Sequence, residues 1–159
     1  MTETTIKRSQ YATFLRTGTG PDVWSLIGSG VVAGTVNMNP DVTTETYVHE
    51  DGATTTIDHY APVMPIEQTA IEGNPVFDFV NNLYKTRAVG SAAETYILQV
   101  ELYKSPVSTD QYPAKKQKVS IQIDSFGGDG GKAPKINYTI NYIGDPVAGL
   151  YDVSAGSFA

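Results

Sequence analysis

Residues 116–143 read KQKVSIQIDSFGGDGGKAPKINYTINYI and decide the fold class. Apolar and polar side chains alternate over Lys116–Asp124 and again over Lys135–Ile143, a period of two that indicates β-strands. The glycine-rich segment Gly127–Gly131 between them is typical of a turn. The stretch therefore predicts two amphipathic strands. Their apolar positions are Val119, Ile121, Ile123, Ile136, Tyr138, Ile140 and Tyr142.

The rest of the chain continues this β pattern around one predicted helix. Asn74 can cap a helix that begins at Pro75, and apolar residues recur at helical spacing over residues 74–87. We find no internal repeat and no linker in residues 1–159. The sequence thus predicts a mainly β, single-domain β-barrel or sandwich with one flanking α-helix. Further strands are expected around Tyr11–Leu15, Val23–Ile27, Val31–Asn39, Thr95–Tyr103 and Gly149–Val153.

Residues 43–60 predict an extended hairpin arm. Two threonine-rich segments flank Asp51-Gly52, and Asp-Gly between β-prone segments is a strong signal for a tight hairpin turn. Neither face of this hairpin carries many large apolar residues, and a lone two-stranded ribbon is marginal in water. We therefore expect the arm to find its partner outside its own domain. The expected contact residues are Thr44, Glu45, Thr46, Tyr47, Val48, His49, Glu50, Asp51, Gly52, Thr54, Thr55 and Thr56.

Composition excludes several function classes. The chain has no cysteine, which excludes disulfides, thiolate zinc sites and thiol nucleophiles. Its net charge of −6, from 17 acidic and 11 basic residues, is wrong for a protein that grips nucleic acid, although DNA can slide past an acidic surface. The sequence shows neither a signal-peptide pattern nor an apolar run near the roughly 18 residues that span a membrane. We expect a soluble protein without a membrane segment.

No motif in the sequence predicts catalysis. Gly28–Ala33 matches G-x-G-x-x-A, but a β-branched run follows it where a nucleotide site needs a helix. His49, Glu50, Asp51 and His59 are the cluster in which a metal site or an acid–base pair is conceivable. A hairpin would bring the two histidines near one another, but an arm lacks the preorganised surroundings that such a site needs. We expect no enzyme activity, no cofactor and no metal.

The non-core faces of three predicted strands carry uncharged polar or mildly acidic residues. One interpretation is an ordinary solvated sheet face. The other is the wall of a wide aqueous barrel built from several chains, with the apolar residues turned outward into each subunit's core. A register slip of one residue would reverse the two faces. The residues expected to face such a lumen are Thr35, Asn37, Asn39, Ser120, Gln122, Asp124, Asn137, Thr139 and Asn141.

Several stretches, in order and over nearly the whole chain, resemble the major tail proteins of long-tailed bacteriophages of Gram-positive hosts. None of them is a catalytic signature, so the resemblance rests on overall likeness. The stretches are Tyr11–Leu15, Val23–Val31, Thr43–Asp51, Thr54–Asp58, Gly73–Val80, Arg87–Gly90, Ser120–Gly131 and Tyr138–Pro146.

This resemblance implies a structural tail tube subunit. In such tubes six copies close a ring, their strands pool into one inner β-barrel, and rings stack in the virion after assembly in the host cytoplasm. A long hairpin commonly reaches a neighbouring ring or subunit. Tape-measure and tail-terminator or distal-tail proteins are the implied partners. Six copies at −6 each would carry −36 per ring, and a neutral or acidic wall would let DNA pass without specific binding.

Other functions remain open at this point. A carbohydrate-binding β-sandwich would need exposed aromatic residues on one face, and the chain has ten tyrosines but a single tryptophan, Trp24. A small hydrolase would need a catalytic set that the sequence does not offer. A distal-tail ring protein that does not polymerise would share the resemblance, and only its assembly behaviour would distinguish it from a tube subunit.

Overall fold

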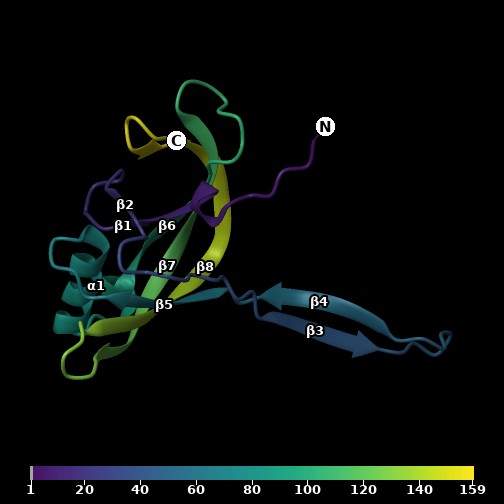
Figure 1. Cartoon of the computed structure of the whole chain (residues 1–159). Helices are drawn as coiled ribbons and strands as arrows, with labels where there is room; N and C mark the ends of the chain where they lie inside the picture. The colour runs from purple at the N-terminus through teal and green to yellow at the C-terminus, as the bar shows by residue number, and fades with distance from the viewer. Residues whose placement is uncertain (1) are drawn as a thin grey trace.

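Within residues 2–159, seven of the nine strands form one antiparallel sheet that curls into a nearly closed barrel (Figure 1). The computed structural model describes residues 2–159. The strand order is β2-β1-β6-β7-β8-β5, β9 pairs with β8, and β3 and β4 form a separate ribbon. The mainly β fold with one α-helix is thus confirmed. The strands are β1 (Tyr11–Arg16), β2 (Trp24–Leu26), β3 (Pro40–Glu45), β4 (Thr54–Tyr60), β5 (Val63–Thr69), β6 (Glu94–Glu101), β7 (Gln111–Gly127), β8 (Lys135–Asp152) and β9 (Ser157–Phe158).

Strands β7 and β8 form the centre of the sheet, with the alternation that the sequence predicts. Val119 and Ile121 of β7 are buried, as are Ile136, Tyr138 and Ile140 of β8. Each fully buried aliphatic side chain of this kind contributes about 1.5–3 kcal/mol through removal of apolar surface from water. The apolar faces of both strands therefore point into the main core.

Strand β8 continues unbroken from Lys135 to Asp152, where the sequence predicts one strand to Ile143 and a second around Gly149–Val153. The register moves from Lys118–Ile143 to Lys116–Val147, so residues 144–146 lie opposite Gln117 alone. Gln117 Nε2 donates a hydrogen bond to the Gly144 carbonyl (2.7 Å), and Gly144 has a φ of 69°. The predicted break is wrong because a bulge absorbs these extra residues without ending the ladder.

Helix α1 (Pro75–Thr86) covers the main core close to where the sequence predicts it. The Asn74 side chain accepts a hydrogen bond from the Phe77 amide (3.0 Å), and Arg87 ends the helix in the left-handed conformation. Val76, Phe77, Val80 and Leu83 are buried, whereas Tyr84 is 43% exposed. Within residues 2–159, no helix has the length and apolar character needed to cross a membrane.

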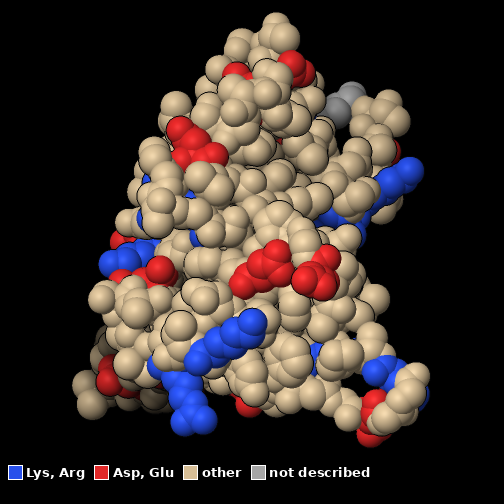
Figure 2. Space-filling view, turned by 90° about the vertical axis from the view of Figure 1, so that its left-hand side faces the viewer, with Lys and Arg blue, Asp and Glu red and all other residues tan. Residues whose placement is uncertain are grey.

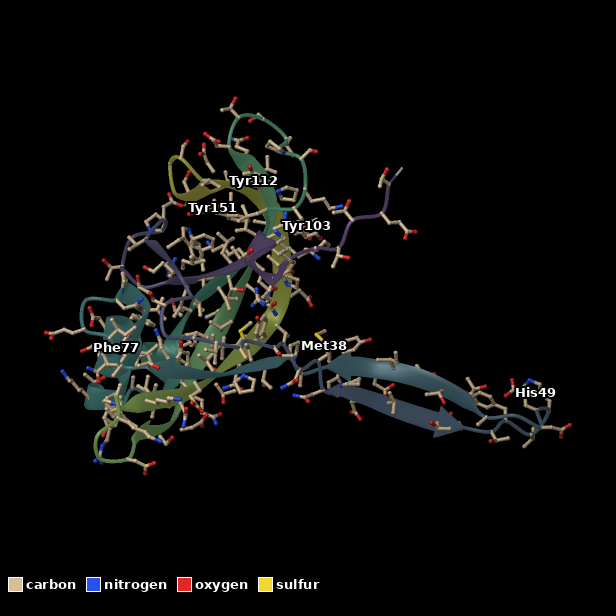
Figure 3. All side chains as sticks on the ribbon, viewed as in Figure 1. Met38, His49, Phe77, Tyr103, Tyr112 and Tyr151 are labelled. Atoms are coloured by element: carbon tan, nitrogen blue, oxygen red, sulfur yellow. The ribbon has the colours of Figure 1, made fainter. Side chains whose placement is uncertain are left out.

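Two apolar clusters lie on opposite faces of the sheet, since the neighbours Ile97 and Leu98 of β6 belong to different clusters. The larger cluster joins α1 to the apolar faces of β5, β7 and β8. The smaller cluster comprises Ala12, Leu98, Val100, Ala114 and Tyr151, with Trp24 and Phe158 packed against it. Figure 3 shows Phe77 at the α1 end and Tyr151 at the other. The sheet is therefore packed on both faces, and the β7–β8 surface opposite the larger cluster is left polar.

The predicted strand Val31–Asn39 does not form. This segment follows the free edge of β5 but bridges it only at Val31–Gln68 and Asn37–Val63. Val63 and Thr69 donate their backbone N–H groups to Asn37 and Gly30 along this edge. By the alternation of the strand, Pro65 presents its backbone to the same edge but has no N–H. A hydrogen-bond ladder between residues 31–39 and β5 is therefore interrupted at Pro65.

Candidate functional site: a polar sheet face and an extended arm

Six of the nine residues expected to face a lumen lie together on one face of the β7–β8 pair. Ser120 lies opposite Asn141, and Gln122 lies opposite Thr139. Residues directly opposite one another share a face, so these side chains form a continuous polar surface on the side away from the main core. The six, here called the polar face, are Ser120, Gln122, Asp124, Asn137, Thr139 and Asn141.

Hydrogen bonds tie the polar face into a network. The Thr139 hydroxyl and Gln122 Nε2 each donate to the Asp124 carboxylate, at 2.7 Å. Asn137 Nδ2 donates to Ser125 Oγ at 2.9 Å. All these contacts lie at exposed positions. Two donors orient the Asp124 carboxylate, and the face presents oxygen acceptors and amides without an unpaired cation among them.

The structure extends the polar face onto β5, which the sequence analysis missed. Pro65 lies opposite Thr139 and Glu67 lies opposite Asn137. Lys135 Nζ pairs with Glu67 Oε1 at 2.8 Å, so this added acid is partly neutralised. The period-two alternation of Met64, Ile66 and Gln68 with Pro65 and Glu67 was the available signal, but a proline inside the segment argues against a strand.

The other three predicted residues lie apart from the polar face or at its margin. Asn37 lies opposite Val63, which lies opposite Asn141, so Asn37 adds one position beyond β5. Asn39 has a φ of 45° and donates from Nδ2 to the Ala61 carbonyl (3.1 Å) where the arm leaves the barrel. Thr35 lines a separate cleft next to β1. The structure brings together the β7–β8 residues but not these three.

The lysine next to the polar face is paired with an acid. On β6, Glu94 lies opposite Ser120, and Lys118 Nζ lies 2.9 Å from Glu94 Oε2. The hydrogen bond to Glu94 raises the pKa of Lys118 above its ordinary value. On the core side, burial raises the pKa of Tyr142. Farther along the same face as Glu94, Arg16 and Lys116 lie over the Tyr96 ring, whereas Asp124 gives the polar face itself its mildly acidic character.

The hairpin arm formed by β3 and β4 projects away from the barrel (Figure 1). Every residue of both strands is exposed. Cross-strand pairs give the ribbon two unlike faces. Val42 lies opposite Ile57 and Pro40 opposite Tyr60 on the apolar face. Asp41 lies opposite His59 on the acidic face, where the Thr43 hydroxyl also donates to Asp58. An exposed ribbon with one apolar face has surface to bury against a partner.

The arm ends in an eight-residue tip, residues 46–53, because Glu45 pairs with Thr54. Neither Asp51 nor Gly52 has a positive φ, so the two-residue turn expected at Asp51-Gly52 is wrong. Within the tip, the Glu50 amide bonds to the Tyr47 carbonyl (3.0 Å), and the Thr54 hydroxyl donates to the Glu50 carboxylate (3.0 Å). These local bonds favour a wider loop over a tight turn.

The two histidines of the arm do not meet. His49 lies at the far end of the arm (Figure 3), 3.5 Å from Glu50. His59 lies near the base, 3.6 Å from Asp41. The hairpin register places Asp41, not His49, opposite His59. Within residues 2–159, no three His, Asp or Glu side chains come together in a group that could hold a metal ion.

Charge is divided unevenly along the chain. Residues 17–84 contain nine Asp and Glu residues and neither Lys nor Arg, and five of those acids lie in residues 40–60. All eleven basic residues belong to residues 1–16 and 85–159, which together carry eight acids. On the side of the barrel away from the arm, acidic and basic side chains are interspersed (Figure 2). The arm is therefore an acidic projection on a barrel of mixed charge.

No family model and no curated protein matches this chain. Among solved structures, its fold is similar to a chain from the tail of an empty GTA particle, which was determined by helical refinement with C6 symmetry. The TM-score is 0.63 at 11% sequence identity, and the match covers 90% of this chain and 98% of the other. At this identity the likeness shows a shared fold, which extends over nearly the full length of both chains.

Proposed function

We propose that this chain is a structural, non-enzymatic subunit of a phage-type tail tube. Six copies close a ring, and rings stack through the arm into a hollow tube that conducts genomic DNA. The observation that carries this proposal is the fold shared with a chain of a C6-symmetric tail over 90% of the sequence. The resemblance of the sequence to major tail proteins of Gram-positive-host phages favours the same role.

The polar face supplies the second support. In the proposed tube, β5, β7 and β8 turn this face to the lumen, while α1 lies behind the sheet. Its residues are amides, hydroxyls and one bonded carboxylate, with Lys135 and Lys118 held by acidic partners. The six residues of the polar face themselves include no cation that would trap the phosphates of passing DNA.

The partners follow from the same role. Further copies of this chain are the principal partner, tape-measure and tail-terminator or distal-tail proteins contact the ends of the tube, and the particle forms in the host cytoplasm. DNA is cargo without a specific binding site. A non-polymerising distal-tail ring remains the alternative within tails.

The first experiment is negative-stain electron microscopy of the purified protein over a concentration series, with and without a molecular crowder. Stacked rings or hollow tubes of constant diameter are expected. Single rings that never stack at any concentration would favour the distal-tail alternative. A protein that stays monomeric under all conditions and binds oligosaccharides on a glycan array would overturn the tail proposal.

A second experiment tests which face lines the lumen. Because the chain has no cysteine, Thr139→Cys introduces a single thiol on the polar face. Assembled tubes are labelled with a maleimide-linked gold cluster and compared with tubes of Val89→Cys, whose side chain is 80% exposed after α1. Gold on the tube axis for Thr139→Cys is expected. Gold confined to the outer edge of the tube would show that the polar face points outward.

A further inference from the structure

A cleft of about 640 Å³ opens between β1 and the segment Leu26–Thr35. Phe14, Val31, Met64 and Ile66 contribute to its largely apolar lining. Beside the cleft, residues 31–37 bridge β5 only at Val31 and Asn37, and this leaves the seam of the barrel unfilled. This volume equals that of about twenty waters, at roughly 30 Å³ each, and the cleft of an isolated subunit is open to solvent. Displacing this water with an apolar group would be favourable.

Val32 and Arg8 mark the mouth of the cleft. Val32 is 99% exposed although it lines the cleft. The Arg8 guanidinium donates to the Gly34 carbonyl (3.3 Å) and to the Tyr11 carbonyl, so it joins the two walls. Within residues 2–159, no carboxylate lies within 4 Å of Arg8. The cleft therefore combines an apolar interior with a cation that has no acidic partner.

The tip of the arm carries the complementary features. Val48 is 108% exposed and Tyr47 is 48% exposed. They form an exposed apolar pair in the tip. Glu45, Glu50 and Asp51 flank this pair in the sequence, and residues 17–84 contain neither Lys nor Arg. An exposed apolar pair flanked by acidic residues is complementary to an apolar cleft with an arginine at its mouth.

We propose that the arm tip of one copy inserts Tyr47 and Val48 into the cleft of a second copy, where Arg8 pairs with an acidic residue of the tip. The arm projects away from its own barrel (Figure 1), so the occupant of each cleft is another copy's tip. A contact between two different patches is heterologous, and its repetition builds a closed ring or an open stack. The inference rests on the proposed function and adds to it the receptor of the arm.

The test uses two introduced cysteines in the otherwise cysteine-free chain. Val48→Cys labels the tip and Val32→Cys labels the mouth of the cleft. The double variant is treated with a short bis-maleimide at concentrations that give rings or tubes in the microscope. A ladder of covalent species beyond the dimer is expected on a denaturing gel, because each copy carries one donor and one acceptor. Either single variant yields at most a dimer.

The matched control is Val48→Cys combined with Val89→Cys, which is also strongly exposed (80%) but lies outside the cleft. No ladder is expected from this pair. If rings or tubes form but the Val48–Val32 pair yields no ladder, or none beyond that of the control, the cleft is not the receptor and the tube role stands. If neither assemblies nor a ladder appear, both proposals fail.

Charge reversal adds a test that does not depend on thiols. Arg8→Glu in the double-cysteine background is expected to lower the yield of cross-linked species about tenfold, because it places like charges together. Adding Asp51→Lys is expected to restore most of that yield. Rescue separates a lost contact from a misfolded cleft. An unchanged yield in Arg8→Glu, or a loss that Asp51→Lys does not relieve, would overturn the pairing of Arg8 with the tip.

Discussion

Gln68 connects four parts of the fold through one buried side chain. It is fully buried on β5, and its Oε1 accepts a hydrogen bond from the Tyr138 hydroxyl (3.0 Å). Its Nε2 donates to the Ser29 carbonyl (3.3 Å) and to Asn74 Oδ1 (3.4 Å). A buried amide with such partners fixes the register of β5 against β8 and the start of α1. Loss of the Gln68 side chain would remove a hydrogen-bond partner from Tyr138, Ser29 and Asn74 together.

Tyr138→Phe is expected to lower the free energy of unfolding by about 1–3 kcal/mol, because it leaves Gln68 Oε1 buried without a donor. Urea unfolding followed by circular dichroism measures the change. Tyr47→Phe, at the exposed tip, is the control and should be neutral. A Tyr138→Phe protein as stable as the parent would show that the hydroxyl is not needed in the core.

Stability is expected to fall with rising pH above about 10. Burial raises the pKa of both Tyr138 and Tyr142 above the ordinary 10.0, so the folded protein retains protons that the unfolded chain loses. This contribution is complete below pH 10 and is lost as the pH rises, by up to about 1.4 kcal/mol per pH unit for each tyrosine. Unfolding measured from pH 8 to 11 should show a shallower decline in the Tyr138→Phe/Tyr142→Phe variant than in Tyr47→Phe.

At the scale of elements, α1 is the part whose local sequence agrees with its surroundings. Asn74 caps the helix and also bonds to Gln68. Asn74→Ala is expected to cost about 1 kcal/mol from the lost cap, with a further loss because one N–H of the Gln68 amide loses its acceptor. Asn74→Asp retains an acceptor and should keep most of the stability. Chemical denaturation of the three proteins checks the order, and equal stability of Asn74→Ala and the parent would contradict it.

The sequence predicts those elements whose side-chain periodicity is uninterrupted. The alternation in β7 and β8 located six polar-face residues, because each strand keeps its register against an apolar core. It missed β5, where Pro65 conceals the period, and it placed a strand at Val31–Asn39, where ladder formation depends on donors in another element. It also divided β8 at residues 144–146, since a bulge and a turn share the same residue types. Pairing partners, not local propensity, decided each of these cases.

At the scale of the whole molecule, the arm is separable from the core. No residue of β3 or β4 belongs to either buried cluster. Replacing residues 44–55 with the dipeptide Asn-Gly keeps Thr43 opposite Thr56 and suits a two-residue hairpin. We expect this variant to retain its circular dichroism spectrum and thermal midpoint but to form no tubes in the electron microscope. Loss of the native spectrum would show that the arm is needed for folding, and normal tubes would remove it from assembly.

The absence of Lys and Arg from residues 17–84 has a consequence for digestion. Trypsin cuts after those two residues, so the most exposed element of this fold presents it with no site, folded or unfolded. A glutamate-specific protease can instead cut after Glu50 on the accessible tip, where nicking is easiest, and after Glu45 at the end of β3. Survival of the arm in trypsin is thus a property of its composition. Survival in the second protease would instead report that the tip has become enclosed.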